Sequence, residues 1–265
     1  MKLELVLRAI LLTPFVGLPT MTLMPSPIDE IDVHTLAIGP DVSHWRPVKS
    51  WTQLLADPRN PTFIGIKATQ GLDFVDGTLK AHRDGFRTSP LLFATYYHYA
   101  RSGSAKDQAH RFMDAVGPLK PNERLCLDLE VSPAPTPTAV IEWLTEFYGE
   151  LMGGACTDRK PLIYTSDRVW QEVCGNLPWT LADDVDGWFK RYSERMLEPG
   201  LPPPWAKASW SFWQWSDGDV PPSSMAGIGP CDTNYFKGTV TDLANYVMGT
   251  MKSGSAGAQK LGSQT

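Results

Sequence analysis

The sequence predicts an α/β fold: a single TIM-like (β/α) barrel that is irregular in its last units. From Ala37 onward, short apolar runs alternate with amphipathic segments, and eight of the runs have the length and composition of strands. Strands separated by helices pair in parallel through crossovers, and eight of them favour a closed barrel over an open sheet. The predicted strands are residues 37–43, 63–69, 91–100, 125–130, 162–165, 187–192, 211–215 and a short run near Asp232.

Amphipathic segments between these runs predict the helices of the barrel. Ser104 is a suitable N-cap for one of them, and Gly117 followed by Pro118 is a suitable stop. The last three units have only weak helical segments between their strands, so the barrel is expected to be irregular there. The predicted helices are residues 79–88, 105–116 and 139–152.

The 265 residues divide into a leader (1–36), the barrel (37–250) and a flexible tail (251–265). The leader begins with charged residues and continues with residues 9–28, which carry no charge. A basic start followed by an apolar run is typical of a secretory signal, so the sequence favours export and an extracytoplasmic location. An uncleaved anchor with transient membrane contact and a disordered leader are the alternatives, since Pro14 and Pro19 oppose a stable spanning helix.

The charge distribution excludes one class of partner. The net charge is −5, and the sequence has no block of like charges. A nucleic-acid surface needs clustered Lys and Arg, so no nucleic-acid partner is expected.

Four cysteines are present, namely Cys126, Cys156, Cys174 and Cys231. They form no C-x-x-C pair or Cys/His cluster, so a zinc site is not expected. Cys156 and Cys174 flank a predicted strand and short helix and are the first disulfide pair to test. Four buried free thiols are the alternative.

Polar residues gather where the predicted strands end. In a parallel barrel, functional residues lie at the C-terminal ends of the strands. This rule brings together four carboxylates and two other polar side chains. They are Asp41, Lys67, His98, Asp128, Glu130 and Asp232.

Residues 125–130 (LCLDLE) give the sharpest local argument. Strand side chains alternate, so the leucines share one face and Cys126, Asp128 and Glu130 share the other. The Cα atoms of Asp128 and Glu130 are then roughly 6.5–7 Å apart. Two carboxyls so close in a shielded cleft cannot both ionise freely, and an acid beside a carboxylate is the arrangement that glycosidases use.

A series of motifs extends this hypothesis to the whole barrel. Their order along the chain resembles that of glycoside hydrolase family 25, the Chalaropsis-type lysozymes or muramidases of bacteria, fungi and phages. The resemblance runs from about residue 37 to residue 250. The motifs are DVSHW (41–45), KATQG (67–71), TYYHYA (95–100), LDLE (127–130), PLIYTS (161–166), FWQW (212–215) and CDTNYF (231–236).

The resemblance implies a role for each carboxylate. Glu130 matches the family's general acid. Asp128 matches a residue that either stabilises the oxocarbenium-like centre or orients the substrate's acetamido group as internal nucleophile. Asp41 and Asp232 match aspartates that line the sugar site. The implied substrate is the β-1,4 bond between N-acetylmuramic acid and N-acetylglucosamine in peptidoglycan, cut by a monomer without a cofactor.

The resemblance also places substrate-binding residues in the cleft. These are Lys67, His98, Tyr164, Gln214 and Trp215. His98 has the alternative of a core histidine, and because Trp213 and Trp215 alternate with Gln214, only one of the two faces lines the cleft.

The sequence departs from the family pattern at Pro40, Trp45, Gln70 and Lys190, the last in a segment that is usually more apolar. None of these departures removes a proposed catalytic carboxylate. A catalytically weak wall-binding protein on the same barrel remains the alternative function.

Overall fold

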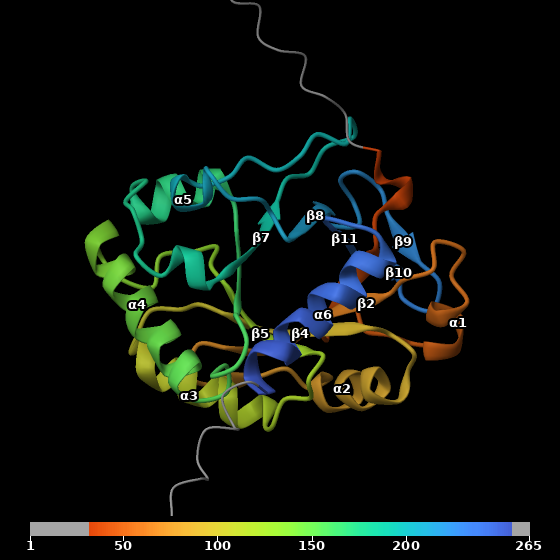
Figure 1. Cartoon of the computed structure of the whole chain (residues 1–265), viewed down its shortest axis with the longest axis horizontal. Helices are drawn as coiled ribbons and strands as arrows, with labels where there is room; N and C mark the ends of the chain where they lie inside the picture. Colours follow the sequence, from red (N-terminus) through yellow and green to blue (C-terminus); the bar gives the residue numbers. More distant parts are fainter. Residues whose placement is uncertain (1–31, 256–265) are drawn as a thin grey trace, which may run out of the picture.

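The computed structural model describes residues 32–255 and contains a closed eight-stranded barrel (Figure 1). Around the barrel, the strands follow the order β1-β11-β8-β7-β6-β5-β4-β2, and pairing of β1 with β2 closes the circle. The strands are β1 (Ile38–Val42), β2 (Phe63–Gln70), β4 (Phe93–Tyr99), β5 (Glu123–Asp128), β6 (Leu162–Thr165), β7 (Asp186–Lys190), β8 (Phe212–Ser216) and β11 (Asp232–Phe236). All eight predicted strands are therefore confirmed.

Strand direction differs from the prediction at one place. Seven strands run parallel, but β11 is antiparallel to both of its neighbours, β1 and β8. No helix connects β8 to β11; the connection contains the small ribbon of β9 (Ser224–Met225) and β10 (Gly229–Pro230). A parallel return requires a crossover, so a connection without one brings the chain back in the opposite direction. The barrel is mixed, and its last units are irregular as expected.

The helices lie where the amphipathic segments predict them. Ser104 caps α3 by accepting a hydrogen bond from the Asp107 amide, and Gly117 ends that helix with a positive φ of 70°. Helix α6 continues to Ser255, beyond the boundary predicted at residue 250. The helices are α1 (Trp51–Leu55), α2 (Leu79–Thr88), α3 (Ala105–Val116), α4 (Pro137–Gly153), α5 (Asp167–Cys174) and α6 (Val240–Ser255).

Short elements complete the chain. Strand β3 (Phe74–Val75) pairs with the end of β2 as an antiparallel hairpin. Three single turns of 3₁₀ helix lie outside the barrel wall, at η1 (Val33–Thr35), η2 (Ala182–Asp184) and η3 (Pro203–Trp205). The turn η3 is the only helical element between β7 and β8 within residues 32–255, which agrees with the weak periodicity of this region.

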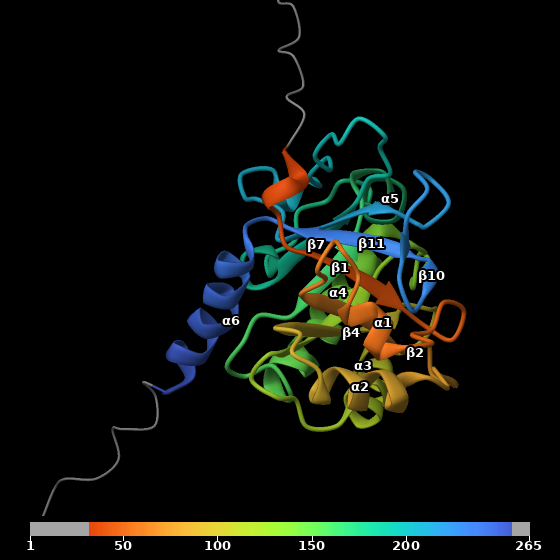
Figure 2. The same ribbon diagram turned by 90° about the vertical axis from the view of Figure 1, so that its right-hand side faces the viewer.

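Two hydrophobic layers fix the strands. The outer layer lies between the strands and the surrounding helices and includes Leu125, Leu127 and Leu129. The inner layer fills the barrel and includes Cys126. Leu243 and Val247 of α6 belong to this inner layer, and α6 lies across one end of the barrel in both views (Figures 1 and 2). This end of the barrel is closed by packing, and the pocket that holds the carboxyls lies at the other end.

All four cysteines are buried and unpaired in the structure, so the Cys156–Cys174 disulfide is not formed. Burial raises the pKa of the Cys156 and Cys174 thiols to about 12. Both thiols therefore behave as small apolar side chains of the core.

Of the predicted leader and tail, residues 1–31 and 256–265 lie outside the described part of the chain. Within residues 32–255, no helix has the length and apolarity that a membrane crossing requires.

Candidate active site

The open end of the barrel holds a pocket of about 320 Å³. Most of its lining side chains project from the C-terminal ends of the parallel strands or from the residues that follow them. Asp232 starts β11 rather than ending it, but the antiparallel direction brings it to the same rim, where it pairs in register with Asp41. The lining residues are Asp41, Ser43, Trp45, Arg46, Lys67, Tyr97, Tyr99, Asp128, Glu130, Tyr164, Trp188, Tyr192, Gln214, Asp217 and Asp232.

Asp128 and Glu130 lie on the same side of the chain, as strand alternation predicts, but in different surroundings. Asp128 is the last residue of β5 and is only 7% exposed. Its Oδ1 atom has no hydrogen-bond partner in the described part of the chain. Burial, and next the charge of Glu130, raise the pKa of Asp128 well above its usual range. Burial therefore makes an ionised Asp128 costly while the pocket is empty.

Glu130 lies two residues further, just outside the strand, and its side chain is 30% exposed. Its Oε2 atom accepts a hydrogen bond from the Nζ atom of Lys190, the last residue of β7. The pair thus consists of a buried carboxyl with a raised pKa and a more accessible carboxyl that contacts a cation.

Asp41 is held by amides instead of a cation. Its Oδ2 atom accepts hydrogen bonds from Nε2 of Gln214 and Nδ2 of Asn234, both at 2.9 Å. Burial raises the pKa of Asp41, while the two amide hydrogen bonds act in the opposite direction. The side chain is therefore fixed in place at the base of the pocket.

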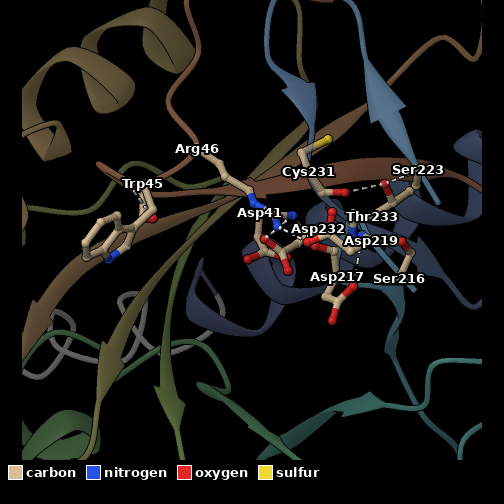
Figure 3. A network of polar contacts seen from close by, with 12 residues as sticks. Asp41, Trp45, Arg46, Ser216, Asp217, Asp219, Ser223, Cys231, Asp232 and Thr233 are labelled. Carbon is tan, nitrogen blue, oxygen red and sulfur yellow. Dashed lines mark hydrogen bonds and ion pairs between the residues drawn. The ribbon is translucent and has the colours of Figure 1, made fainter. Parts of the chain in front are cut away.

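Asp232 lies beside Arg46, with 4.0 Å between Oδ2 and Nη1 (Figure 3). Arg46 also donates hydrogen bonds to the Asp217 carbonyl and to Oδ2 of Asp219, the latter at 2.9 Å. Burial and the charge of Asp41 raise the pKa of Asp232 to about 8. Three of the four predicted carboxyls therefore have raised pKa values.

Aromatic and amide side chains form the rest of the pocket wall. The hydroxyls of Tyr164 and Tyr192 donate to Oε1 of Gln214, at 2.6 and 2.9 Å. Lys67 lies 5.1 Å from the ring centroid of Tyr99 and 5.8 Å from that of Tyr97. These contacts place Lys67, Tyr164 and Gln214 in the pocket, as the sequence predicts.

Two predicted substrate-binding residues do not line the pocket. His98 is fully buried on the outer side of β4, where it contacts the Thr69 hydroxyl at 2.8 Å and Oε1 of Gln108 at 3.0 Å. Burial lowers its pKa to about 4, so it is a neutral core histidine. Trp215 also points outward, stacked on Tyr235, because its neighbour Gln214 takes the inward position. Both predictions are wrong.

Sequence reasoning missed several pocket residues. Tyr97 and Tyr99 both face inward, and the signal for them is the same alternation that turns His98 outward. Trp45 and Arg46 lie in the loop after β1, where no periodicity predicts a direction. Trp45 is 80% exposed and extends away from the carboxyl cluster (Figure 3). An exposed aromatic ring at the pocket edge is a surface on which a sugar ring can stack.

The donor set does not indicate a metal. Within residues 32–255, no group of three or more His, Cys, Asp or Glu side chains is arranged to hold a metal ion. Two neighbouring carboxyls at the rim of a barrel, one buried and one more accessible, are typical of the class of barrel glycosidases.

Comparison with known proteins identifies the family. The family model described as Glycosyl hydrolases family 25 matches residues 40–223. The chain therefore belongs to glycosyl hydrolase family 25 and is a glycoside hydrolase. Strand β11, which carries Asp232, lies beyond the matched residues.

The chain is similar to three known proteins in particular. It is 29% identical to the uncharacterized protein YegX of Escherichia coli (strain K12), over 80% of this chain and 73% of the relative. It is 29% identical to an N,O-diacetylmuramidase of Arthroderma benhamiae, over 72% of this chain and 82% of the relative. Its fold matches the bacterial lysozyme from Streptomyces coelicolor with a TM-score of 0.70 and 24% identity, over 81% of this chain and 98% of the other.

Proposed function

We propose that this protein is a muramidase that hydrolyses the β-1,4 bond between N-acetylmuramic acid and N-acetylglucosamine in peptidoglycan. The observation that carries the proposal is the unequal carboxyl pair, with Asp128 buried and Glu130 accessible in one pocket. The family membership and the muramidase relative support the same substrate. Because peptidoglycan lies outside the cytoplasmic membrane, we infer an extracytoplasmic site of action.

Glu130 is the general acid of the proposed reaction. Its protonated carboxyl donates to the glycosidic oxygen as the bond from that oxygen to the sugar C1 breaks. The carbonyl oxygen of the substrate's acetamido group bonds to C1 and forms a cyclic intermediate. Water then attacks C1, and the bond between C1 and the acetamido oxygen breaks, so the cyclic intermediate opens. The Glu130 carboxylate accepts the proton of the water.

Asp128 supports the acetamido group in this scheme. Its Oδ1 atom has no partner in residues 32–255, so it is suited to accept the acetamido N–H. Stabilisation of the positive charge at C1 by the Asp128 carboxylate is the alternative role. Asp41 and Asp232 lie at the same rim, where they would contact the same sugar.

The wall around the carboxyls has the chemistry of a sugar site. Lys67, Gln214 and Tyr192 offer hydrogen bonds to hydroxyl and carbonyl groups, and Trp45 offers an apolar ring face. Such pockets bind through a few directed polar groups and a larger apolar area. The monomeric state and export through the leader remain predictions.

A direct test compares the full-length protein with Glu130→Gln on purified peptidoglycan sacculi, with soluble fragments analysed by mass spectrometry. We expect fragments with muramic acid at the reducing end from the unmodified protein and none from Glu130→Gln. Glu146→Gln, an exposed position on α4, is the matched control and should leave the fragments unchanged.

The ion pair of Lys190 with Glu130 favours one competing function, a wall-binding protein with little catalysis. Sedimentation with sacculi distinguishes the two. Binding without any fragment release by the unmodified protein would refute the muramidase proposal.

A further inference from the structure

Arg46 joins two loops at the open end of the barrel. It lies in the loop after β1, and its guanidinium reaches the loop after β8, residues 217–223 (Figure 3). There it donates hydrogen bonds to the Asp217 carbonyl and, at 2.9 Å, to Oδ2 of Asp219. Strand β11 lies between β1 and β8, so Arg46 spans the start of the strand that carries Asp232.

The loop and the guanidinium fit closely at Gly218. A Cβ atom at this position would clash with Nη1 of Arg46 and would lie 2.7 Å from the backbone nitrogen of Cys231. Its φ of +90° also favours glycine. The near end of the loop, residues 217–220, is braced internally by hydrogen bonds from its backbone amides to Oδ1 of Asp217. Arg46 therefore holds a well-defined loop end that packs against the residue before β11.

The far end of the loop, at Ser223, is bonded to both neighbours of Asp232. The Ser223 carbonyl accepts a hydrogen bond from the Cys231 amide at 3.2 Å, and its Oγ atom lies 2.7 Å from Oγ1 of Thr233. The carboxyl of Asp232 lies 4.0 Å from Nη1 of Arg46. The loop thus holds the backbone around Asp232, and Arg46 faces its carboxyl.

A second arginine, Arg59, holds the far end of the loop. Its Nη1 atom donates to Oγ of Ser223 at 3.2 Å, and its Nη2 atom donates to the carbonyl of Ser224. Arg59 is not among the residues that line the pocket, whereas Arg46 and Asp217 are. The two arginines therefore hold opposite ends of the loop, and the end that forms part of the pocket wall depends on Arg46.

We propose that Arg46 is a positioning residue of this site, which holds the near end of the loop against the rim and thereby keeps the Asp232 carboxyl beside Asp41. The proposal rests on the proposed function, in which these two aspartates contact the substrate sugar. Loss of the contact lets the loop end and the carboxyl move, and a displacement of about 1 Å in a site can lower the rate by up to about 10²-fold. A planar guanidinium directs several donors at one loop, which the single ammonium of a lysine does not do.

The test measures kcat and KM on soluble glycan fragments for the full-length protein, Arg46→Gln and Asp219→Ala. We expect kcat to fall by about 10-fold in Arg46→Gln and by about 3-fold in Asp219→Ala, with KM changed by less than about 2-fold. The Asp219 side chain is 73% exposed and does not line the pocket, so its loss removes no contact with substrate there. The double variant should lose no more than Arg46→Gln, because both changes break the same contact.

Two matched controls repeat these side-chain changes elsewhere. Arg168→Gln and Asp183→Ala, at exposed positions on α5 and η2, should leave kcat unchanged. Arg46→Lys keeps the charge but not the planar donor set, so its kcat should lie between those of the unmodified protein and Arg46→Gln.

A second measurement does not need substrate. Hydrogen–deuterium exchange, followed by mass spectrometry, should show faster exchange of the amides of residues 217–220 in Arg46→Gln and in Asp219→Ala. The amide of Ser223, at the end that Arg59 holds, should change less.

Unchanged exchange of residues 217–220 in both variants would overturn the proposal. A raised KM in Arg46→Gln, with full activity in Asp219→Ala, would also overturn it and would show that Arg46 only contacts substrate. Faster exchange throughout the barrel, including α4, would reduce Arg46 to a general stabilising residue. If the unmodified protein releases no fragments, the muramidase proposal fails, and the exchange measurement still decides whether Arg46 holds the loop.

Discussion

The two sides of the pocket hold their carboxyls by different means. On the β1–β11 side, Asp41 is fixed by two neutral amides, Gln214 and Asn234. On the β5–β7 side, Glu130 is held by one flexible cation, Lys190. Two amide hydrogen bonds fix a carboxyl in place, whereas a single long side chain such as lysine can move with the carboxyl that it contacts. The proposed function uses the first side to orient substrate and the second side for proton transfer.

The largest effect is expected on the β5–β7 side, from Asp128→Asn. Asparagine keeps the size of the side chain but cannot supply a carboxylate to the acetamido group or to C1. We expect kcat/KM on sacculi to fall by about 10²–10⁴-fold. Asp114→Asn on the exposed face of α3 is the matched control. Full activity in Asp128→Asn would remove this residue from the mechanism.

Gln214→Leu tests the amide side. It removes one of the two donors to Asp41 and the acceptor shared by Tyr164 and Tyr192. Loss of buried hydrogen bonds costs about 1–3 kcal/mol, so kcat/KM should fall by about 5- to 150-fold. Steady-state kinetics on soluble glycan fragments measures the change. A larger loss than in Asp128→Asn would reverse the assignment of the two sides.

Trp45→Ala tests the exposed aromatic ring at the edge of the pocket. The ring is largely exposed and contributes little to stability. A stacking contact with a sugar ring contributes about 0.5–1.5 kcal/mol, so its loss should raise KM by about 2- to 12-fold. We expect kcat to remain unchanged, because the ring extends away from the carboxyls. Trp45→Phe should restore most of the affinity. A fall in kcat alone would contradict this role.

The last prediction concerns stability, not activity, and uses Asp232→Asn. The pKa of Asp232 is about 8 in the folded protein against an ordinary value of 3.8, so the folded state binds the extra proton between these values. The unfolding free energy therefore falls as pH rises through this window. Asparagine removes the titration, so the variant should match the unmodified protein near pH 4 and exceed it at pH 8 in urea unfolding. Equal stability at both pH values would contradict the raised pKa.

The sequence predicts most of the barrel because each strand is an apolar run. Helix signals also separate most of these runs. The direction of β11 is the exception, because an apolar run does not show which way a strand points. An apolar run near Asp232 has the same composition in either direction, so the antiparallel β11 could not be predicted from it. Its orientation follows from the connection after β8, which has no crossover helix.

Strand alternation predicts pocket residues correctly where the sequence also shows which face of the strand packs in the core. The leucines of residues 125–130 identify the core side of β5 and leave Asp128 and Glu130 for the pocket. Residues 95–100 have no such reference, because aromatic rings suit both faces, and His98 was placed on the wrong one. In addition, the pairing of β2 with β4 shifts register between Lys67 and Thr69, so the two residues face opposite sides despite their even spacing.

The pairing of Asp41 with Asp232 joins the first and the last strand of the barrel. During synthesis, Asp41 leaves the ribosome early, but its neighbour at the rim follows nearly two hundred residues later. Until β11 has emerged, the nascent chain has an open wall between β1 and β8. The order of translation therefore delays completion of the cleft until the last barrel strand has been made.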